Sequence, residues 1–275
     1  MSDSHRPGAW RIGRLFGVDL LIRPSLLILG AILVVVFAPR YENWTDTNPY
    51  VLSTIFVVSL YVSILVHEIA HLVMARSYGM RVDSVTLHLL GGETLIAGQS
   101  RTPSQELLTS IVGPAASLAI ALGAFGVSDA LGTGTAADVV WSIAVVNLIV
   151  AIFNMIPGLP LDGGRVFRAV IWMVTRDEEV GIRAAGWVGR LTAVALVVAA
   201  LVTFGDAEEG VLNLLVAAMV AVVLWQGASQ ALRSAARTAR INQPLPASSR
   251  CPVRHHRQGP SPCPQICTAP SCCVP

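Results

Sequence analysis

Two histidines flank a glutamate in the five-residue stretch His67-Glu68-Ile69-Ala70-His71. Positions i and i+4 of a helix lie on one face, so both imidazoles can reach a single metal ion. Glu68 can stand next to a water molecule on that metal and act as its general base. The pattern therefore predicts a zinc site in which His67 and His71 are ligands and Glu68 is the catalytic carboxylate.

The surroundings of this pattern strengthen the prediction. It follows the apolar run 51–66, and a carboxylate at the centre of a membrane-spanning helix costs roughly 2.5–3.5 kcal/mol even on lenient insertion scales. A helix with a purely structural role offers nothing that offsets this cost. The alternative is that neighbouring helices hydrogen bond both histidines and that Glu68 pairs with one of them.

A catalytic zinc ion usually has three protein ligands and a water molecule, so a third ligand is needed. Asp162 is the best candidate in the apolar body, within the stretch NMIPGLPLDGGR (154–165). The prolines there break a helix, the paired glycines allow close backbone approach, and a new helix is expected to begin near Asp162. From spacing alone, Asp162 is explained equally well as the N-terminal cap of that helix.

The composition indicates a membrane protein. Hydrophobic residues make up 53% of the 275 residues and charged residues only 13%, and the mean hydropathy is +0.63. A soluble domain carries roughly 25% charged residues, so the polar surface here is too small for a water-facing exterior. The net charge of +2 is too small to suggest that nucleic acid is a partner.

Several apolar stretches reach the roughly 17–25 residues that a membrane-spanning helix needs. We count six of them, at 20–38, 51–78, 106–127, 139–156, 187–204 and 211–228. Arg23 and Pro24 interrupt the beginning of the first. Between the second and third, β-branched residues around Gly91 and Gly92 predict a short β-hairpin over 82–96. The predicted fold is thus an all-α polytopic membrane protein with about six transmembrane helices and one short hairpin.

The arginines predict how the chain is oriented in a cell membrane. Most of them lie before the first span, between the second and third, between the fourth and fifth, or after the sixth. The loops on the opposite face hold Arg40 beside several acidic residues. Cytoplasmic loops accumulate Arg and Lys, so both termini are expected to be cytoplasmic.

Three motifs in order resemble the site-2 protease family of intramembrane zinc metalloproteases: HEIAH in an apolar segment, Gly113-Pro114 in the next, and NMIPGLPLDGGR. The resemblance runs from about residue 10 to residue 230. It implies one zinc ion held by His67, His71 and Asp162. It also implies cleavage of a peptide bond in or near the transmembrane segment of a membrane-anchored protein, in regulated intramembrane proteolysis.

The resemblance further implies that Asn154 contacts substrate or the developing oxyanion. The alternative for Asn154 is a hydrogen bond at a helix end or between helices. His88, in the predicted hairpin, is either a fourth metal contact or an interfacial residue. The hairpin itself offers an edge onto which an unwound substrate segment could add as a strand.

We expect three parts in the chain: a cytoplasmic N-terminal segment (1–19), a membrane-embedded metalloprotease domain (20–230) and a cytoplasmic, disordered tail (231–275). From about residue 241 the sequence is rich in Pro, Ser, Cys and Arg and has no apolar periodicity. All five cysteines lie there, at a spacing that fits no zinc module. A truncated or frame-shifted reading of a longer gene is the alternative explanation for the tail.

Two other functions fit part of the pattern. A transporter or channel could use intramembrane His, Glu and Asp for ion passage, although we find no internal repeat of the kind that transporters often show. A homologue without activity could bind membrane segments as a scaffold. The expected partners are a membrane-anchored protein substrate and the lipid bilayer, and the sequence predicts no oligomeric state.

Overall fold

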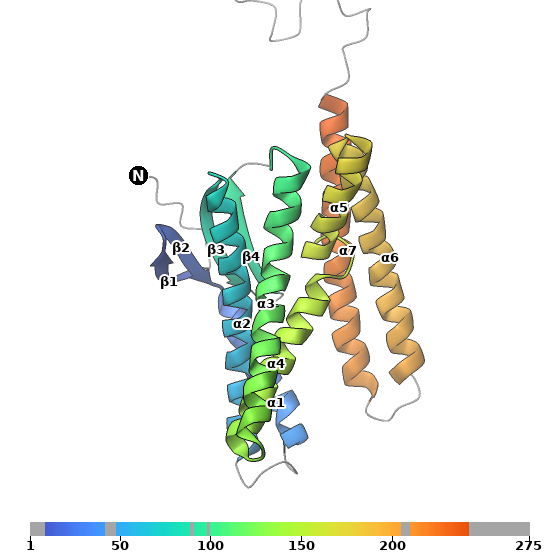
Figure 1. Ribbon diagram of the computed structural model, residues 1–275. Coiled ribbons are helices and arrows are strands. Elements are labelled where there is room, and N and C mark those ends of the chain that lie inside the picture. The colour runs from blue at the N-terminus through green and yellow to red at the C-terminus, as the bar shows by residue number, and fades with distance from the viewer. Residues whose placement is uncertain (1–8, 42–47, 89–90, 98–99, 205–209, 242–275) are drawn as a thin grey trace, which may run out of the picture.

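The computed structural model describes residues 9–41, 48–88, 91–97, 100–204 and 210–241 (Figure 1). The elements follow in this order: β1 (Trp10–Leu15), β2 (Val18–Ile22), α1 (Pro24–Phe37), a 3-10 helix η1 (Ala38–Tyr41), α2 (Pro49–Ser77), β3 (Arg81–His88), β4 (Gly91–Ala97), α3 (Pro103–Leu131), α4 (Thr135–Asn154), α5 (Asp162–Thr175), α6 (Glu178–Phe204) and α7 (Gly210–Ile241). The cysteines of the predicted tail lie outside the described residues.

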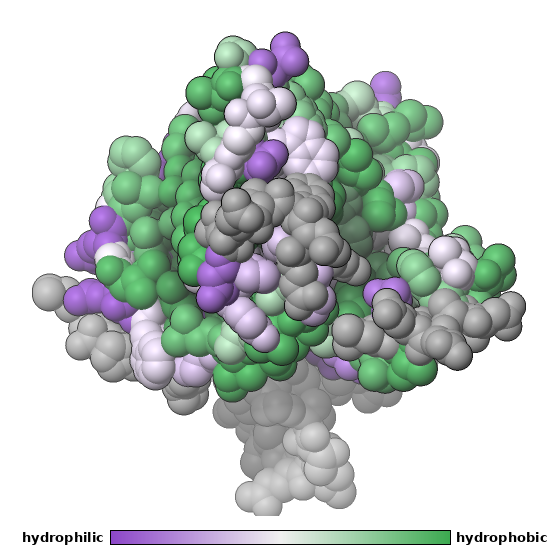
Figure 2. Space-filling model, turned by 90° about the horizontal axis from the view of Figure 1, so that it is seen from below, coloured by the Kyte–Doolittle hydropathy of each residue, from purple (hydrophilic) through white to green (hydrophobic). Residues whose placement is uncertain are grey.

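Within the described residues, five helices are long and apolar enough to cross a membrane: α2, α3, α4, α6 and α7. Many of their large apolar side chains are exposed, and hydrophobic residues cover much of the molecule in an end-on view (Figure 2). Such an exterior suits lipid and not water. The predicted multi-pass membrane protein is confirmed.

The first predicted span, 20–38, is wrong at its beginning. Residues up to Ile22 belong to strand β2, and the helix α1 has only 14 residues. Arg23 is extended, with φ −89° and ψ 141°, because proline disfavours a helical conformation in the residue before it. Pro24 then begins the helix, where its missing N–H costs no hydrogen bond.

The other helices match the predicted spans, although α2 ends one residue and α4 two residues before the predicted ends, and several begin earlier or end later than predicted. Polar caps fix two of the beginnings: the side chain of Asn48 accepts a hydrogen bond from Tyr50 N at 2.9 Å, and Thr102 Oγ1 accepts one from Gln105 N at 3.3 Å. Helix α6 begins before its predicted span with charged residues, and α7 ends after its span with several arginines. An apolar window excludes such residues, but a helix does not have to end where lipid ends.

The predicted hairpin is confirmed as β3 and β4, which pair antiparallel. It belongs to a four-stranded sheet of order β1-β2-β3-β4, in which β2 and β3 are parallel. The N-terminal pair β1 and β2, joined by the turn Phe16-Gly17, was not predicted. The sheet packs on α2 through a small core of Val18, Leu72 and Val85.

Helix α3 is central to the site. It packs against α2, α4 and α5, while α5 also packs against α6, and α6 pairs with α7 (Figure 1). Both sequence motifs that predicted metal ligands therefore lie on elements that touch α3: the paired histidines on α2 and Asp162 at the beginning of α5.

Candidate metal centre

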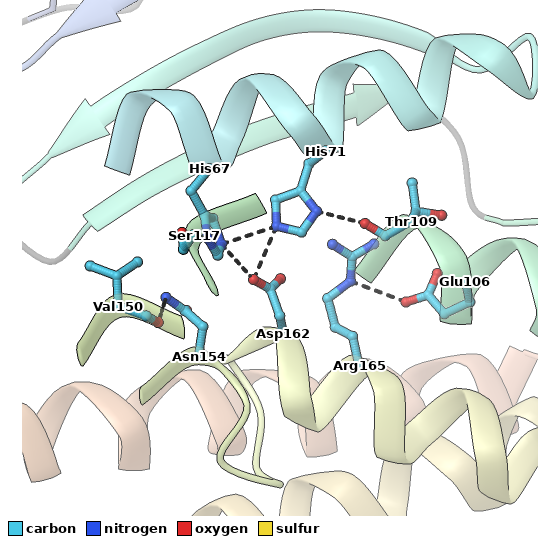
Figure 3. A network of polar contacts seen from close by, with 9 residues as sticks. All are labelled: His67, His71, Glu106, Thr109, Ser117, Val150, Asn154, Asp162 and Arg165. Carbon is cyan, nitrogen blue, oxygen red and sulfur yellow. Dashed lines mark hydrogen bonds and ion pairs between the residues drawn. The ribbon is translucent and has the colours of Figure 1, made fainter. Parts of the chain in front are cut away.

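The two predicted histidine ligands lie together on one buried face of α2. Each is only 3% exposed, and their Nε2 atoms are 3.2 Å apart. One helical turn separates them, so both rings point to the same side of the helix (Figure 3). The first expectation from the sequence, two imidazoles that can share one ion, is met by the geometry.

Asp162, from a segment more than 90 residues away, completes the group. Its Oδ2 atom lies 2.9 Å from His67 Nε2 and 3.0 Å from His71 Nε2 (Figure 3). Ligands bound to a tetrahedral zinc ion at its usual distances lie roughly 3.3 Å from one another. The three donor atoms thus fit a zinc ion in chemical type and in spacing.

The outward-facing nitrogens of both imidazoles are held by α3. His71 Nδ1 lies 2.6 Å from the carbonyl oxygen of Thr109, and His67 Nδ1 lies 3.1 Å from Ser117 Oγ. A carbonyl can only accept, so Nδ1 of His71 carries a proton, and Nε2 is the nitrogen that faces Asp162. Partners of this kind orient metal-binding histidines and select the tautomer that binds.

The structure argues against one of the two explanations of Asp162. Helix α5 has Leu161 as its N-cap and no side-chain cap hydrogen bond, so a capping role alone is wrong. Burial raises the pKa of Asp162, but its hydrogen bonds with His67 and His71 outweigh burial and hold the pKa of this carboxyl well below its usual range. The group is therefore ionised at neutral pH, as a metal ligand must be.

The loop before α5 is packed closely enough to fix where Asp162 lies. A Cβ atom on Gly163 would lie 2.4 Å from the carbonyl oxygen of Met155, and one on Gly164 would lie 2.3 Å from the backbone of Gly158. Leu159 N donates a hydrogen bond to Ala185 O of α6 at 3.3 Å. The glycine pair predicted to allow close approach does so here.

Gly113 of α3 lies directly against the metal centre. A Cβ atom there would be 2.3 Å from His71 Nε2 and 2.7 Å from His67 Nε2, in the space that the three ligands enclose. In the sequence, Gly113-Pro114 was only one of three motifs that carry the family resemblance, and its contact with the imidazoles was not predicted. Spacing cannot reveal it, because it depends on how α2 and α3 are rotated against each other.

The remaining predicted residues lie in different settings. Glu68 is buried (8% exposed) and acts electrostatically on Arg165. Burial lowers the pKa of Arg165, but the negative charges of Glu106, Asp162 and Glu68 together keep that pKa above its usual value. Asn154 Nδ2 donates to Val150 O at 3.0 Å, the helix-end bond that was its alternative. The side chain of His88 lies outside the described part of the structure.

Comparison with known proteins matches these elements to a family. The model of peptidase family M50 matches residues 55–133 and 128–199, which include the paired histidines, Gly113 and Asp162. The site-2 protease from Methanocaldococcus jannaschii superposes with a TM-score of 0.61 at 20% identity, over 82% of this chain and 95% of that one. The two proteins share a fold.

Two curated relatives are similar in sequence. A candidate zinc metalloprotease of Synechocystis sp. is 33% identical over 184 residues, which cover 66% of this chain and 48% of the relative. The candidate zinc metalloprotease Rip3 of Mycobacterium tuberculosis is 36% identical over 203 residues, 70% of this chain and 51% of the relative. The chain spans about half the length of these relatives.

The contact at Gly113 gives a direct test of the metal centre. We expect Gly113→Ala to abolish stoichiometric metal binding, because the new methyl group would fill the space between the imidazoles. The matched control is Gly123→Ala on the same helix, where a Cβ atom meets nothing within 4 Å. Metal analysis of both purified variants is the measurement, and full metal content in Gly113→Ala would contradict the geometry.

Proposed function

The chain belongs to peptidase family M50, and from this membership we propose that it is a zinc-dependent intramembrane endopeptidase that cuts membrane-anchored proteins. The observation that carries the proposal is the convergence of Asp162 Oδ2 with the two imidazoles of α2. Three protein donors, with no fourth found among the residues that the structure describes, match catalytic zinc sites, which keep one position for water or substrate.

The proposed chemistry is hydrolysis of a peptide bond. A zinc ion held by His67, His71 and Asp162 would lower the pKa of a water molecule and polarise the scissile carbonyl. Glu68, next to His67, takes the proton from the attacking water and gives it to the leaving nitrogen. Asn154, close to the end of α4, is proposed to contact the substrate near the carbonyl that becomes negatively charged.

The substrate class follows from the position of the ligands on a spanning helix. A bond cut there lies in or near the transmembrane segment of a membrane-anchored protein, which suits regulated intramembrane proteolysis. A helical segment hides its peptide bonds in its own hydrogen bonds, so it must unwind first. We propose that the unwound segment adds to β4, the strand at one end of the sheet, which packs against α2.

An ion transporter is the competing function, since it would also keep ionisable groups inside the membrane. The tight cluster argues against it. Donor atoms about 3 Å apart, oriented by Thr109 and Ser117, suit a resident ion more than a passing one.

We propose that both termini are cytoplasmic, on the arginine distribution, which requires α1 to cross the membrane in addition to the five longer helices. On this topology the loop between α3 and α4 faces away from the cytoplasm, whereas the connection between α5 and α6 faces it.

Substitution of the general base separates the competing functions. We expect Glu68→Gln to keep its zinc and to lose about 10²–10⁴-fold in cleavage of a single-span reporter protein, because a proton acceptor is removed and the ligands remain. Asp162→Ala should lose both zinc and cleavage. Metal analysis and cleavage of the reporter in detergent are the measurements. Undiminished cleavage by Glu68→Gln, or an ion flux without proteolysis in the unaltered protein, would end the proposal.

Strand addition is tested by proline substitution along β4. The N–H groups of successive strand residues point to opposite edges of the strand. Of Thr94→Pro and Leu95→Pro, one therefore removes an outward N–H donor at the free edge of β4, and the other removes an inward donor that faces β3. We expect the outward change to reduce cleavage of the reporter while zinc content stays constant. Arg14→Pro on β1, at the other end of the sheet, is the control. Full cleavage by both β4 variants would rule strand addition out.

The topology is tested with cysteines, because the sequence has none before residue 251. With the five native cysteines changed to serine, Thr133→Cys places an exposed thiol in the α3–α4 loop, and Thr175→Cys places one at the end of α5, beside the connection to α6. A membrane-impermeant maleimide should label Thr133→Cys in intact cells and Thr175→Cys only after the membrane is opened. The reverse pattern would invert the proposed orientation.

A further inference from the structure

A buried carboxylate outside the metal centre connects α3 to α5. Glu106 is 3% exposed and lies near the beginning of α3. One of its oxygens is 3.1 Å from Arg165 Nε on α5 (Figure 3). The same oxygen is 3.7 Å from Arg168, and the other accepts a hydrogen bond from Ser100 Oγ at 2.6 Å.

Glu106 lies on the face of α3 that meets the metal ligands. Glu106, Thr109, Gly113 and Ser117 are spaced by three, four and four residues, so they form one stripe along the helix. Thr109 and Ser117 bind the two imidazoles of α2, and Gly113 leaves the space between them. One helix face therefore contacts the histidine half of the centre and, through Glu106, the helix that carries the third ligand.

The position of Asp162 depends on side-chain contacts between α5 and its neighbouring helices. Helix α5 has 14 residues and follows a loop with two prolines, so no preceding helix sets its rotation. Arg165 comes one turn after Asp162 and lies on the same side of α5. Arg168, one turn further, also binds Glu178 of α6 at 2.5 Å, which ties the far side of α5 to α6.

We propose that Glu106 is a positioning residue for the metal centre: by holding Arg165, it fixes α5 against α3 so that Asp162 Oδ2 meets the imidazoles. This inference rests on the proposed zinc site but not on any proteolytic step. The competing explanation is that the two half-buried arginines only neutralise the buried charge of Glu106, since a buried charge needs a partner wherever it lies. In that case its loss would lower stability and leave the zinc affinity of the folded protein unchanged.

The test measures zinc affinity of the full chain in detergent, by competition with a chelator and without any peptide substrate. We expect Glu106→Gln and Arg165→Gln each to weaken zinc binding about tenfold, the size typical of partners outside the ligand sphere. The double variant should bind zinc no more weakly than either single variant, because both changes break the same ion pair. Glu179→Gln, which breaks the exposed Glu179–Arg183 pair on α6, is the matched control and should bind zinc normally.

A conservative replacement separates a positioning role from a role in stability alone. Arg165→Lys keeps the charge but loses the planar fork, and it should recover part of the zinc affinity that Arg165→Gln loses. It also serves as the milder variant if Glu106→Gln does not fold. Normal zinc affinity in folded Glu106→Gln or Arg165→Gln would overturn the proposal, and so would additive losses in the double variant. If the unaltered protein and its variants bind zinc as expected but the unaltered protein cleaves no reporter, the proposed function is refuted and the positioning role of Glu106 is not.

Discussion

The contact between the Asp162 carboxylate and the two imidazoles of α2 is the interaction on which the rest of the site depends. It joins residues 95 and 91 positions apart in the chain, across two different helices. A carboxylate and two imidazoles in a largely apolar interior are stable only when they are paired with one another or with a metal ion. The helices that carry them must therefore be held at one distance and one rotation.

Helix α3 meets this requirement by combining small and polar residues on a single face. Apolar burial between helices adds little inside a lipid bilayer, so close packing and hydrogen bonds have to supply the specificity. Gly113 lets α3 approach both imidazoles, and Thr109 and Ser117 bind their outer nitrogens. The same face ends in Glu106, whose bonds reach α5. The same contacts of α3 therefore set both how the helices pack and where the metal ligands lie.

The loop that presents Asp162 is irregular backbone within a membrane protein, where exposed N–H and C=O groups are costly. Here the loop lies against protein. Gly158 packs on Gly189 of α6, where a Cβ atom would lie 2.7 Å from the facing backbone, and Leu159 N is bonded to Ala185 O. The α6 and α7 pair therefore does more than cross the membrane, because it supports the segment that delivers the third ligand.

The sequence by itself determined what depends on neighbouring residues. Hydropathy located the spanning helices, although it assigned the strand residues before Pro24 to the first of them, and the i, i+4 spacing placed both histidines on one helix face. β-branched residues beside a glycine pair predicted the hairpin of β3 and β4.

Only the tertiary structure decided the rest. Asp162 as a partner of the imidazoles and not a cap, the contact at Gly113, the bond from Glu106 to Arg165 and the pairing of β2 with β3 all join segments far apart in the chain. Each depends on how two elements are rotated and spaced against each other. Residue spacing along one chain carries no information about that relation, so a single sequence could name these residues but not bring them together.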